Sequence, residues 1–330
     1  MKMITQIKSR LFLLLLVLTC AGSALADTTF KITDGVVESQ LKDRMEANTK
    51  ALLDAFRKAA DDGEKTVKLS KDNISKAAIE EIREIWKSSA LSCPPMSIRC
   101  RCLQTKDGYQ VRGIPVDMLE ADEADARQEL TVNYDHNGLI TSVAIAIEMN
   151  RYEELMAAKE SELDYARRQI IVDFIENFRT AYNRKDNAML NSVFSDKALI
   201  ITVVREKPNS DMTKMTLANN KVVYIKQTKQ EYLSKLAMVF KTVKFINVKF
   251  SDIEIVEHPK YDNIYGVTLK QLWKTDRYQD EGYLFLMVDF RDSDNPLIQV
   301  RTWQPYKDTA GNIVTQKKDV FHLGSFRIVR

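Results

Sequence analysis

The sequence predicts an α+β protein built from two units, and the order of its helical and strand-like segments carries that prediction. Apolar residues recur at helical spacing over 36–61 and 74–88, and from residue 97 the period changes to two. The same change from helices to strands occurs again in the second half. Helices followed by hairpin-joined strands favour α+β over the βαβ alternation of a parallel sheet. We therefore expect a small αα-ββββ domain over 27–149 and a second domain over 150–330.

Turn residues divide the first unit. The first helix stops at Asp61-Asp62-Gly63, and Pro94-Pro95 prevents the second from continuing. Two Gly-containing turns then mark two hairpins. The predicted strands are 98–104, 109–116, 128–134 and 139–147.

The second unit repeats the rhythm with longer elements. Its longest helical run is 151–184, and a short helix, a strand and a third helix precede a run of strands separated by Asp- and Asn-rich turns. The predicted elements after the long helix are helix 188–194, strand 198–205, helix 228–240, strands 246–257, 263–275, 281–291 and 296–305, and a last strand 320–329.

The stretch 178–186, FRTAYNRKD, ends the long helix in a polar break, and the apolar pairs Met189-Leu190 and Val193-Phe194 follow before a strand. In this order of elements, residues 151–305 resemble the nuclear-transport-factor-2-like superfamily, also called SnoaL-like or cystatin-like. The resemblance implies a bent antiparallel sheet wrapped as a cone on the long helix. The stretch 321–326, FHLGSF, is similar to exported bacterial members.

The first 26 residues are typical of a cleavable signal peptide. Lys2, Lys8 and Arg10 precede an unbroken apolar run, Leu11 to Leu18, and Ala24-Leu25-Ala26 forms a small-x-small cleavage site. The run is too short to cross a bilayer core about 30 Å thick. We therefore expect a periplasmic or secreted protein with no transmembrane span. Lipid anchoring through Cys20 is an alternative that Thr at position 19 disfavours.

Removal of this segment changes the charge of the protein. The segment contains three basic and no acidic side chains, so the mature chain carries 46 of each and no net charge. A general attraction to nucleic acid or anionic lipid is therefore not expected.

Three cysteines remain in the mature chain, in a compartment that permits disulfides. Cys100 and Cys102 share one face of a predicted strand, and Cys93 lies in a turn just before it. Three buried or partly buried structural thiols are the favoured interpretation, and a disulfide from Cys93 to Cys100 or Cys102 is the functional alternative. No histidine lies near enough for a metal site, and we expect no metal.

Strand alternation predicts which side chains enter the cone. In 281–291 the alternate residues from Leu284 to Phe290 are uniformly apolar and are expected to face inward. The inward polar and aromatic side chains, which we interpret as ligand-binding, are Tyr182, Tyr265, Gln271, Trp273 and Thr302.

This inward set contains no carboxylate and no histidine, one of which general acid–base catalysis would need. We therefore predict no catalytic residue and no cofactor. Asp289 would turn inward only if a one-residue bulge shifted the register of strand 281–291. His136 and His258 lie at or beside turns, and His322 lies on the predicted last strand.

The opposite face of the same sheet carries large apolar side chains: Leu272, Phe285, Met287 and Trp303. Because monomers rarely expose contiguous apolar patches of several hundred Å², we expect this face to be an interface. The rest of the same chain, a second copy in a homodimer and an envelope protein are the three alternatives for its cover.

These observations favour an exported, non-catalytic binding or scaffolding protein of the bacterial cell envelope. Its partner would be a small apolar ligand in the cone or an envelope protein on the sheet. The alternative, which the resemblance implies, is a SnoaL-like lyase or isomerase that acts on a small apolar substrate.

Overall fold

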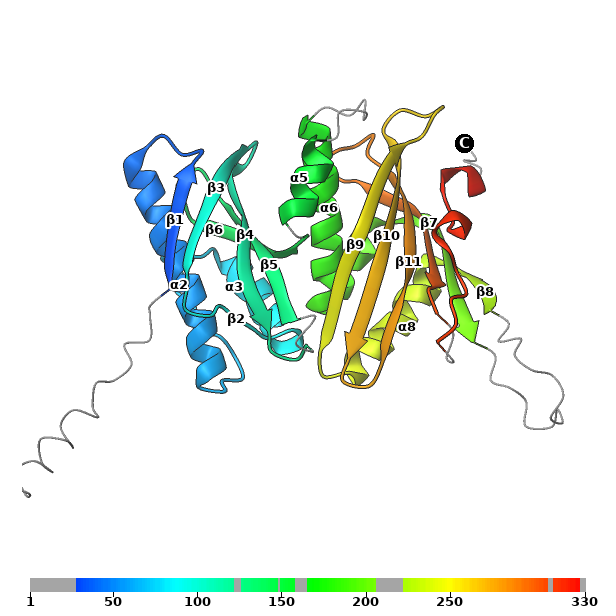
Figure 1. Cartoon of the computed structure of the whole chain (residues 1–330), viewed down its shortest axis with the longest axis horizontal. Helices are drawn as coiled ribbons and strands as arrows, with labels where there is room; N and C mark the ends of the chain where they lie inside the picture. The colour runs from blue at the N-terminus through cyan, green and yellow to red at the C-terminus, as the bar shows by residue number, and fades with distance from the viewer. Residues whose placement is uncertain are drawn as a thin grey trace, which may run out of the picture.

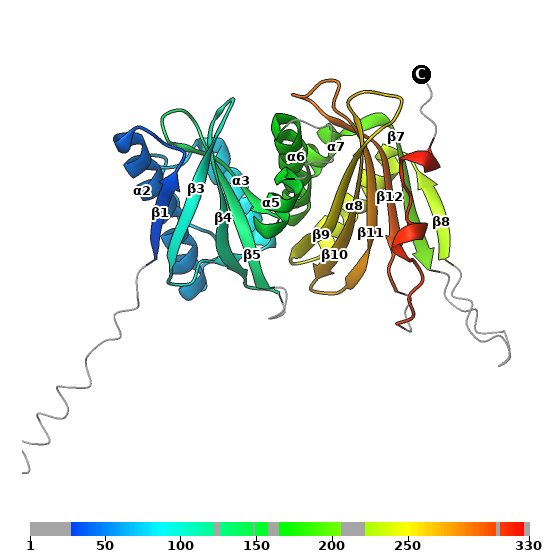
Figure 2. The same cartoon turned by 45° about the horizontal axis from the view of Figure 1, so that its top comes forward.

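The computed structural model describes residues 28–121, 126–147, 149–157, 165–205, 222–307 and 311–326. Within these residues, the helices and two sheets form the predicted α+β arrangement. Figures 1 and 2 show the sheets side by side, with α5 (Met149–Ala157) and α6 (Tyr165–Asn183) between them. The predicted signal peptide and Cys20 lie outside the described residues. No helix of the described part is both long and apolar enough to cross a bilayer.

The first unit comprises β1 (Thr29–Asp34), α2 (Ser39–Asp61), α3 (Lys76–Ser88), β2 (Leu91–Ser92), β3 (Ser97–Thr105), β4 (Gly108–Met118), β5 (Arg127–Tyr134) and β6 (Ile140–Ala146). Its sheet runs in the order β1-β3-β4-β5-β6, with β2 paired to β4. Among the described strand pairs of this sheet, β1 and β3 are parallel and the others are antiparallel. One sheet face packs on α2 and α3 in a closed apolar core that includes Phe56, Ile82 and Val132.

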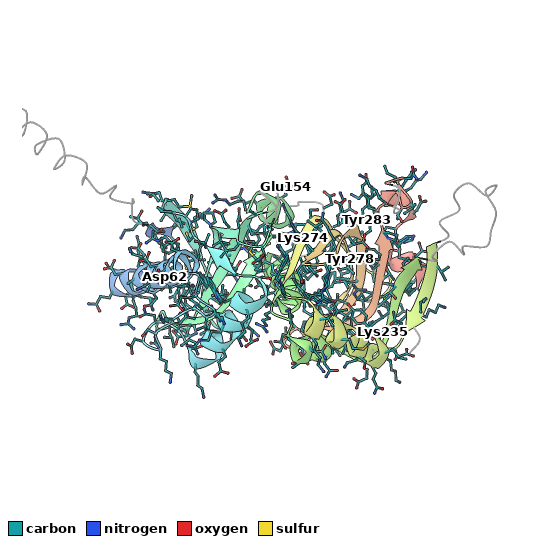
Figure 3. The ribbon with its side chains drawn as sticks, turned by 90° about the horizontal axis from the view of Figure 1, so that it is seen from below. Asp62, Glu154, Lys235, Lys274, Tyr278 and Tyr283 are labelled. Carbon is teal, nitrogen blue, oxygen red and sulfur yellow. The ribbon has the colours of Figure 1, made fainter. Side chains whose placement is uncertain are left out.

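The second unit continues with α7 (Asn187–Val193), β7 (Phe194–Arg205), β8 (Val222–Gln227), α8 (Lys229–Thr242), β9 (Ile246–Glu257), β10 (Ile264–Thr275), β11 (Gln279–Asp289) and β12 (Leu297–Pro305). Its sheet has the order β8-β7-β12-β11-β10-β9, with β7 parallel to β12. We call the face that packs against α6, α7 and α8 the inner face, and the opposite face the outer face. Figure 3 shows Lys235 of α8 and Tyr283 of β11 on opposite sides of this sheet.

Helix α6 connects the edge strands of the two sheets through polar side chains. Arg179, 1 % exposed, donates from Nη1 to the Ala146 carbonyl of β6 (3.0 Å) and from Nε to the Val248 carbonyl of β9 (2.5 Å). The hydroxyl of Thr180 accepts from the Ile145 backbone amide at 3.0 Å. One helix therefore supplies hydrogen-bond partners for two backbone groups at the edge of the first sheet and one at the edge of the second. Without α6 these three groups would need water.

The end of the described chain crosses the outer face of the second sheet and is not the predicted strand. Residues 311–326 form two short 3-10 turns, η2 (Lys317–Asp319) and η3 (Leu323–Ser325), which we call the tail. Gln304 of β12 holds it, because its Oε1 accepts from the Phe321 amide at 2.8 Å. Over residues 320–326 the predicted strand is wrong, because His322 caps η3 and accepts from the Gly324 amide at 3.1 Å. The rest of that predicted strand, 327–329, lies outside the described residues.

Candidate functional site

The inner face of β10 carries three of the residues expected to bind a ligand. The register between β10 and β11 has no shift, so Tyr265 lies opposite Val288 and Gln271 lies opposite Gly282. Residues directly opposite in an antiparallel pair share a face. Tyr265, Gln271 and Trp273 therefore face inward, as their alternation predicts.

A bulge in β12 reverses the faces expected for two other residues. Ile298 pairs with Val288, but Val300 pairs with Met287, so Gln299 is an extra residue on β12. Beyond it, Thr302 lies opposite Phe285 on the outer face, and its predicted inward position is wrong.

The same bulge turns Trp303 inward and brings Arg301 to the inner face. Trp303 lies opposite Leu284, so its assignment to the outer face is also wrong. Arg301 lies between Leu286 of β11 and Ile200 of β7, both buried in the inner core. Regular alternation along the predicted strand 296–305, without a bulge, would place Arg301 on the outer face. The sequence therefore does not predict its inward position.

Arg301 is a buried cation among aromatic side chains. It is 5 % exposed, and its guanidinium lies 4.8 Å from the ring centre of Tyr232. The hydroxyls of Tyr182 and Tyr232 share a 2.8 Å hydrogen bond. No hydrogen-bond partner among the described residues reaches Nε or Nη1 of Arg301, and no described carboxylate pairs with it. Burial raises the pKa of Tyr182 well above its usual value, so this phenol stays neutral and does not balance the charge.

The structure brings only part of the predicted ligand-binding set together. Tyr182 packs edge-on against Trp273 with ring centres 5.4 Å apart, beside Arg301. Gln271 belongs to the same end of the sheet, and its buried Oε1 has no partner among the described residues. Tyr265 lies six residues before Gln271 on β10, which is about 20 Å away. Its hydroxyl donates to Glu257.

The outer face of the second sheet is covered by the chain itself. Phe285 and Met287 are buried in a small cluster with Leu323 of the tail. The ring of Phe285 stacks on Phe326 with centres 5.7 Å apart. The tail therefore covers these two predicted interface residues, whereas Leu272 stays partly exposed.

Asp289 remains on the outer side, because the bulge lies in β12 and not in β11. Its carboxylate accepts from Arg291 Nε at 2.9 and 3.0 Å and from Nη2 at 2.5 Å. Burial alone would raise the pKa of Asp289, but the hydrogen bonds and charge of Arg291 outweigh it and hold the pKa below its usual value. An ionised, fully bonded carboxylate of this kind is a poor proton donor.

All three cysteines of the described chain are free and buried, as the favoured interpretation predicts, and the alternative disulfide from Cys93 is wrong. The pairing of β4 with β2 and β3 explains their separation. Ser92 lies opposite Asp117 of β4, whereas Cys102 lies opposite Val111, six residues or about 20 Å along the strand. A disulfide requires Cα atoms within about 7 Å.

A second candidate site is a cavity of about 620 Å³ between the first sheet and α6. The sheet face that borders it is polar, because the apolar side chains of β4 and β5 point to the opposite core. Gln110, Thr131 and Asn133 come from this face, and Asp173 and Glu176 come from α6. In the sequence these strand residues alternate with apolar ones, a pattern that a solvated sheet face shows equally.

A buried ion pair lies at the wall of this cavity. Arg112 of β4 pairs with Glu176, and Glu176 also accepts from the Ile147 amide at 2.8 Å. The Arg112 guanidinium lies 4.0 Å from the ring centre of Tyr152 of α5. Burial, reinforced by the charge of Glu176, raises the pKa of Asp173 to about 6. No three potential metal ligands of the described part gather in a way that could hold an ion.

Comparisons with known proteins find similarity only among solved structures. No protein-family model matches the sequence. No curated protein matches it. Solved structures similar to this chain include an NTF2-like protein from Cytophaga hutchinsonii, with 15 % identity over 42 % of this chain and 97 % of that chain at a TM-score of 0.31. That protein is of the superfamily that residues 151–305 are predicted to resemble.

Two further solved structures are also similar. Bd1075 from Bdellovibrio bacteriovorus has 13 % identity over 62 % of this chain and 79 % of that chain, with a TM-score of 0.34. A naphthalene 1,2-dioxygenase with indole bound in its active site has 9 % identity over 48 % of this chain and 88 % of that chain, also with a TM-score of 0.34. All three TM-scores are low, and the fold is defined by the helices and strands of the chain itself.

Proposed function

We propose that this chain is an exported, non-catalytic binding protein that holds a small ligand against the inner face of its second sheet. The ligand has an apolar body and an anionic group, and Arg301 receives the anionic group. Export follows from the predicted signal peptide. The single observation that carries the proposal is the buried Arg301 charge, which has no carboxylate partner among the described residues.

Burial of an unpaired charge is costly, so a buried cation is normally paired with an anion. Cation–π contact with Tyr232 offsets part of that cost, but it leaves two guanidinium nitrogens without acceptors. A carboxylate oxygen would accept from one of these donors in a charge-assisted hydrogen bond. Gln271 and the Trp273 ring, nearby on the same face, supply an unpaired amide oxygen and an apolar surface.

The test compares two ligands that share the phenylpropyl body and differ in the head group: the anionic 3-phenylpropanoate and the neutral 3-phenylpropanol. Mature protein is titrated with each by calorimetry. We expect the carboxylate to bind at least about tenfold more tightly, since a hydrogen bond to a charged group contributes about 1.5–3 kcal/mol. Arg301→Met should abolish the preference, and Arg301→Lys should retain part of it.

Arg277→Met is the matched control, because it removes an exposed arginine that pairs with Asp276 at the turn after β10. It should leave the preference unchanged. Equal affinity for acid and alcohol, or binding of neither at millimolar concentration, would contradict the proposal. Conversion of either probe, lost in Arg301→Met, would instead support a lyase or isomerase.

A further inference from the structure

The cavity between the first sheet and α6 has an excess of negative charge at its wall. Arg112 supplies one positive charge, which Glu176 neutralises in a buried pair. Asp173 adds a second carboxylate, 3.5 Å from the same guanidinium. At the rim, Lys106 is already paired with Asp294, and Asp107 adds a further carboxylate. An anionic ligand would therefore meet net repulsion here, whereas a cation would be attracted.

Asp173 presents one of its two oxygens to the cavity. Its Oδ1 accepts from Gln169 Nε2 at 2.9 Å and from Gln110 Nε2 at 3.2 Å. No described residue bonds Oδ2, and about a third of the side chain, 32 %, is exposed. The carboxylate is thus held in a fixed orientation by one oxygen, and its other oxygen is open to a donor.

A hydroxyl group of the cavity wall, independent of Asp173, also lacks a hydrogen-bond partner. Thr131 is 1 % exposed and borders the cavity, and no described residue bonds its hydroxyl. An unpaired buried hydroxyl costs free energy unless a ligand or water satisfies it. The remaining wall consists mainly of amides and hydroxyls, including Asn133, Ser142 and Asn177. Such groups suit a ligand that carries several hydroxyls.

We propose that this cavity binds a small organic cation that also carries hydroxyl groups, with Asp173 Oδ2 receiving its ammonium group. The volume is within the range of small-molecule sites, about 300–1,000 Å³. This site is separate from Arg301 and does not depend on the function proposed above.

The pH dependence of binding follows from the groups that face Asp173. These are Glu176 on its own helix, Arg112 on β4 and the Tyr152 ring on α5. Since the pKa of Asp173 is about 6, its ionised fraction falls about tenfold between about pH 7 and about pH 5. An ammonium ligand, protonated at both pH values, should lose affinity by about the same factor.

The experiment uses glucosamine and glucose, which share a ring and differ by an ammonium in place of one hydroxyl. Calorimetric titration of the mature protein at about pH 7 should show binding of glucosamine at least about tenfold tighter than that of glucose. Asp173→Asn should remove this preference. Thr131→Val should weaken glucosamine binding by several-fold, because it deletes the unpaired hydroxyl and keeps the shape.

Asp262→Asn is the control, because it makes the same change of charge on an exposed turn. It and Arg301→Met should both bind glucosamine normally, so failure at one site is distinguishable from failure at the other. Equal binding of the two sugars, binding of neither, or the same affinity at both pH values would overturn the proposal. The pH comparison needs only wild-type protein and decides the question even if Asp173→Asn does not fold.

Discussion

Replacement of Arg179 by methionine should destabilise the whole protein, because this side chain bonds both sheets. The substitution removes donors from the Ala146 and Val248 carbonyls and from the Gln128 amide oxygen, all of them buried contacts. Each orphaned buried acceptor costs about 1–3 kcal/mol, and loss of one partner from a buried charged network costs about 3–5 kcal/mol. We expect the free energy of unfolding to fall by about 3–5 kcal/mol, a large share of a typical 5–15 kcal/mol.

Equilibrium unfolding in urea measures this loss and shows whether the two units still unfold together. Trp86 belongs to the first core, whereas Trp273 packs against the inner core of the second sheet. In a Trp86→Phe background, fluorescence reports the second unit alone, and circular dichroism reports both. The two signals should coincide in the parent and separate after Arg179→Met.

Arg277→Met, which removes an exposed arginine, should change stability by no more than about 0.5 kcal/mol. A loss below about 1 kcal/mol for Arg179→Met, with a single shared transition, would refute the argument that this guanidinium couples the two sheets.

Three further predictions concern the tail, the thiols and Asp173. Leu323→Ala should lower the free energy of unfolding by about 2–3 kcal/mol in urea titrations, whereas Val314→Ala, on an exposed part of the tail, should have little effect. Burial raises the pKa values of the three thiols to about 11 or 12, so a thiol reagent at about pH 8 should react with none of them in native protein and with three after unfolding. One rapidly reacting native thiol, or fewer than three after unfolding, would contradict this. Because the pKa of Asp173 is raised in the folded state, wild-type stability relative to Asp173→Asn should decline as pH rises from about 4 through about 6, and a flat difference would contradict the shift.

The spacing of apolar residues predicted most helices and strands, because an element that buries one face carries apolar residues at regular intervals. It failed in β12, where pairing with the neighbouring strands decides the faces. Ile298, Gln299 and Val300 alternate as a regular strand would, yet the bulge at Gln299 places the two apolar residues on opposite faces. Everything beyond it is reversed, which is why Thr302 was expected inward and Arg301 was missed. Bulges depend on pairing with neighbouring strands, which a single strand's sequence does not contain.

Other failures had different causes. Strand β1 was not predicted, although Phe30 and Ile32 alternate with exposed residues, because six residues give a weak signal beside a cleavage site. The site between the first sheet and α6 was missed because it joins segments more than 60 residues apart, as the Arg112–Glu176 pair does. Its polar strand residues indicate a solvated face equally well, and only the position of α6 turns them into the wall of a cavity.

The tail has a consequence for limited proteolysis of this protein. Residues 311–326 follow every described strand of both sheets, so their removal would leave the strands in place and uncover Phe285 and Met287. Exposed contiguous apolar surface of this kind promotes association between molecules. A protein trimmed before residue 311 would therefore keep both sheets and gain an adhesive outer face.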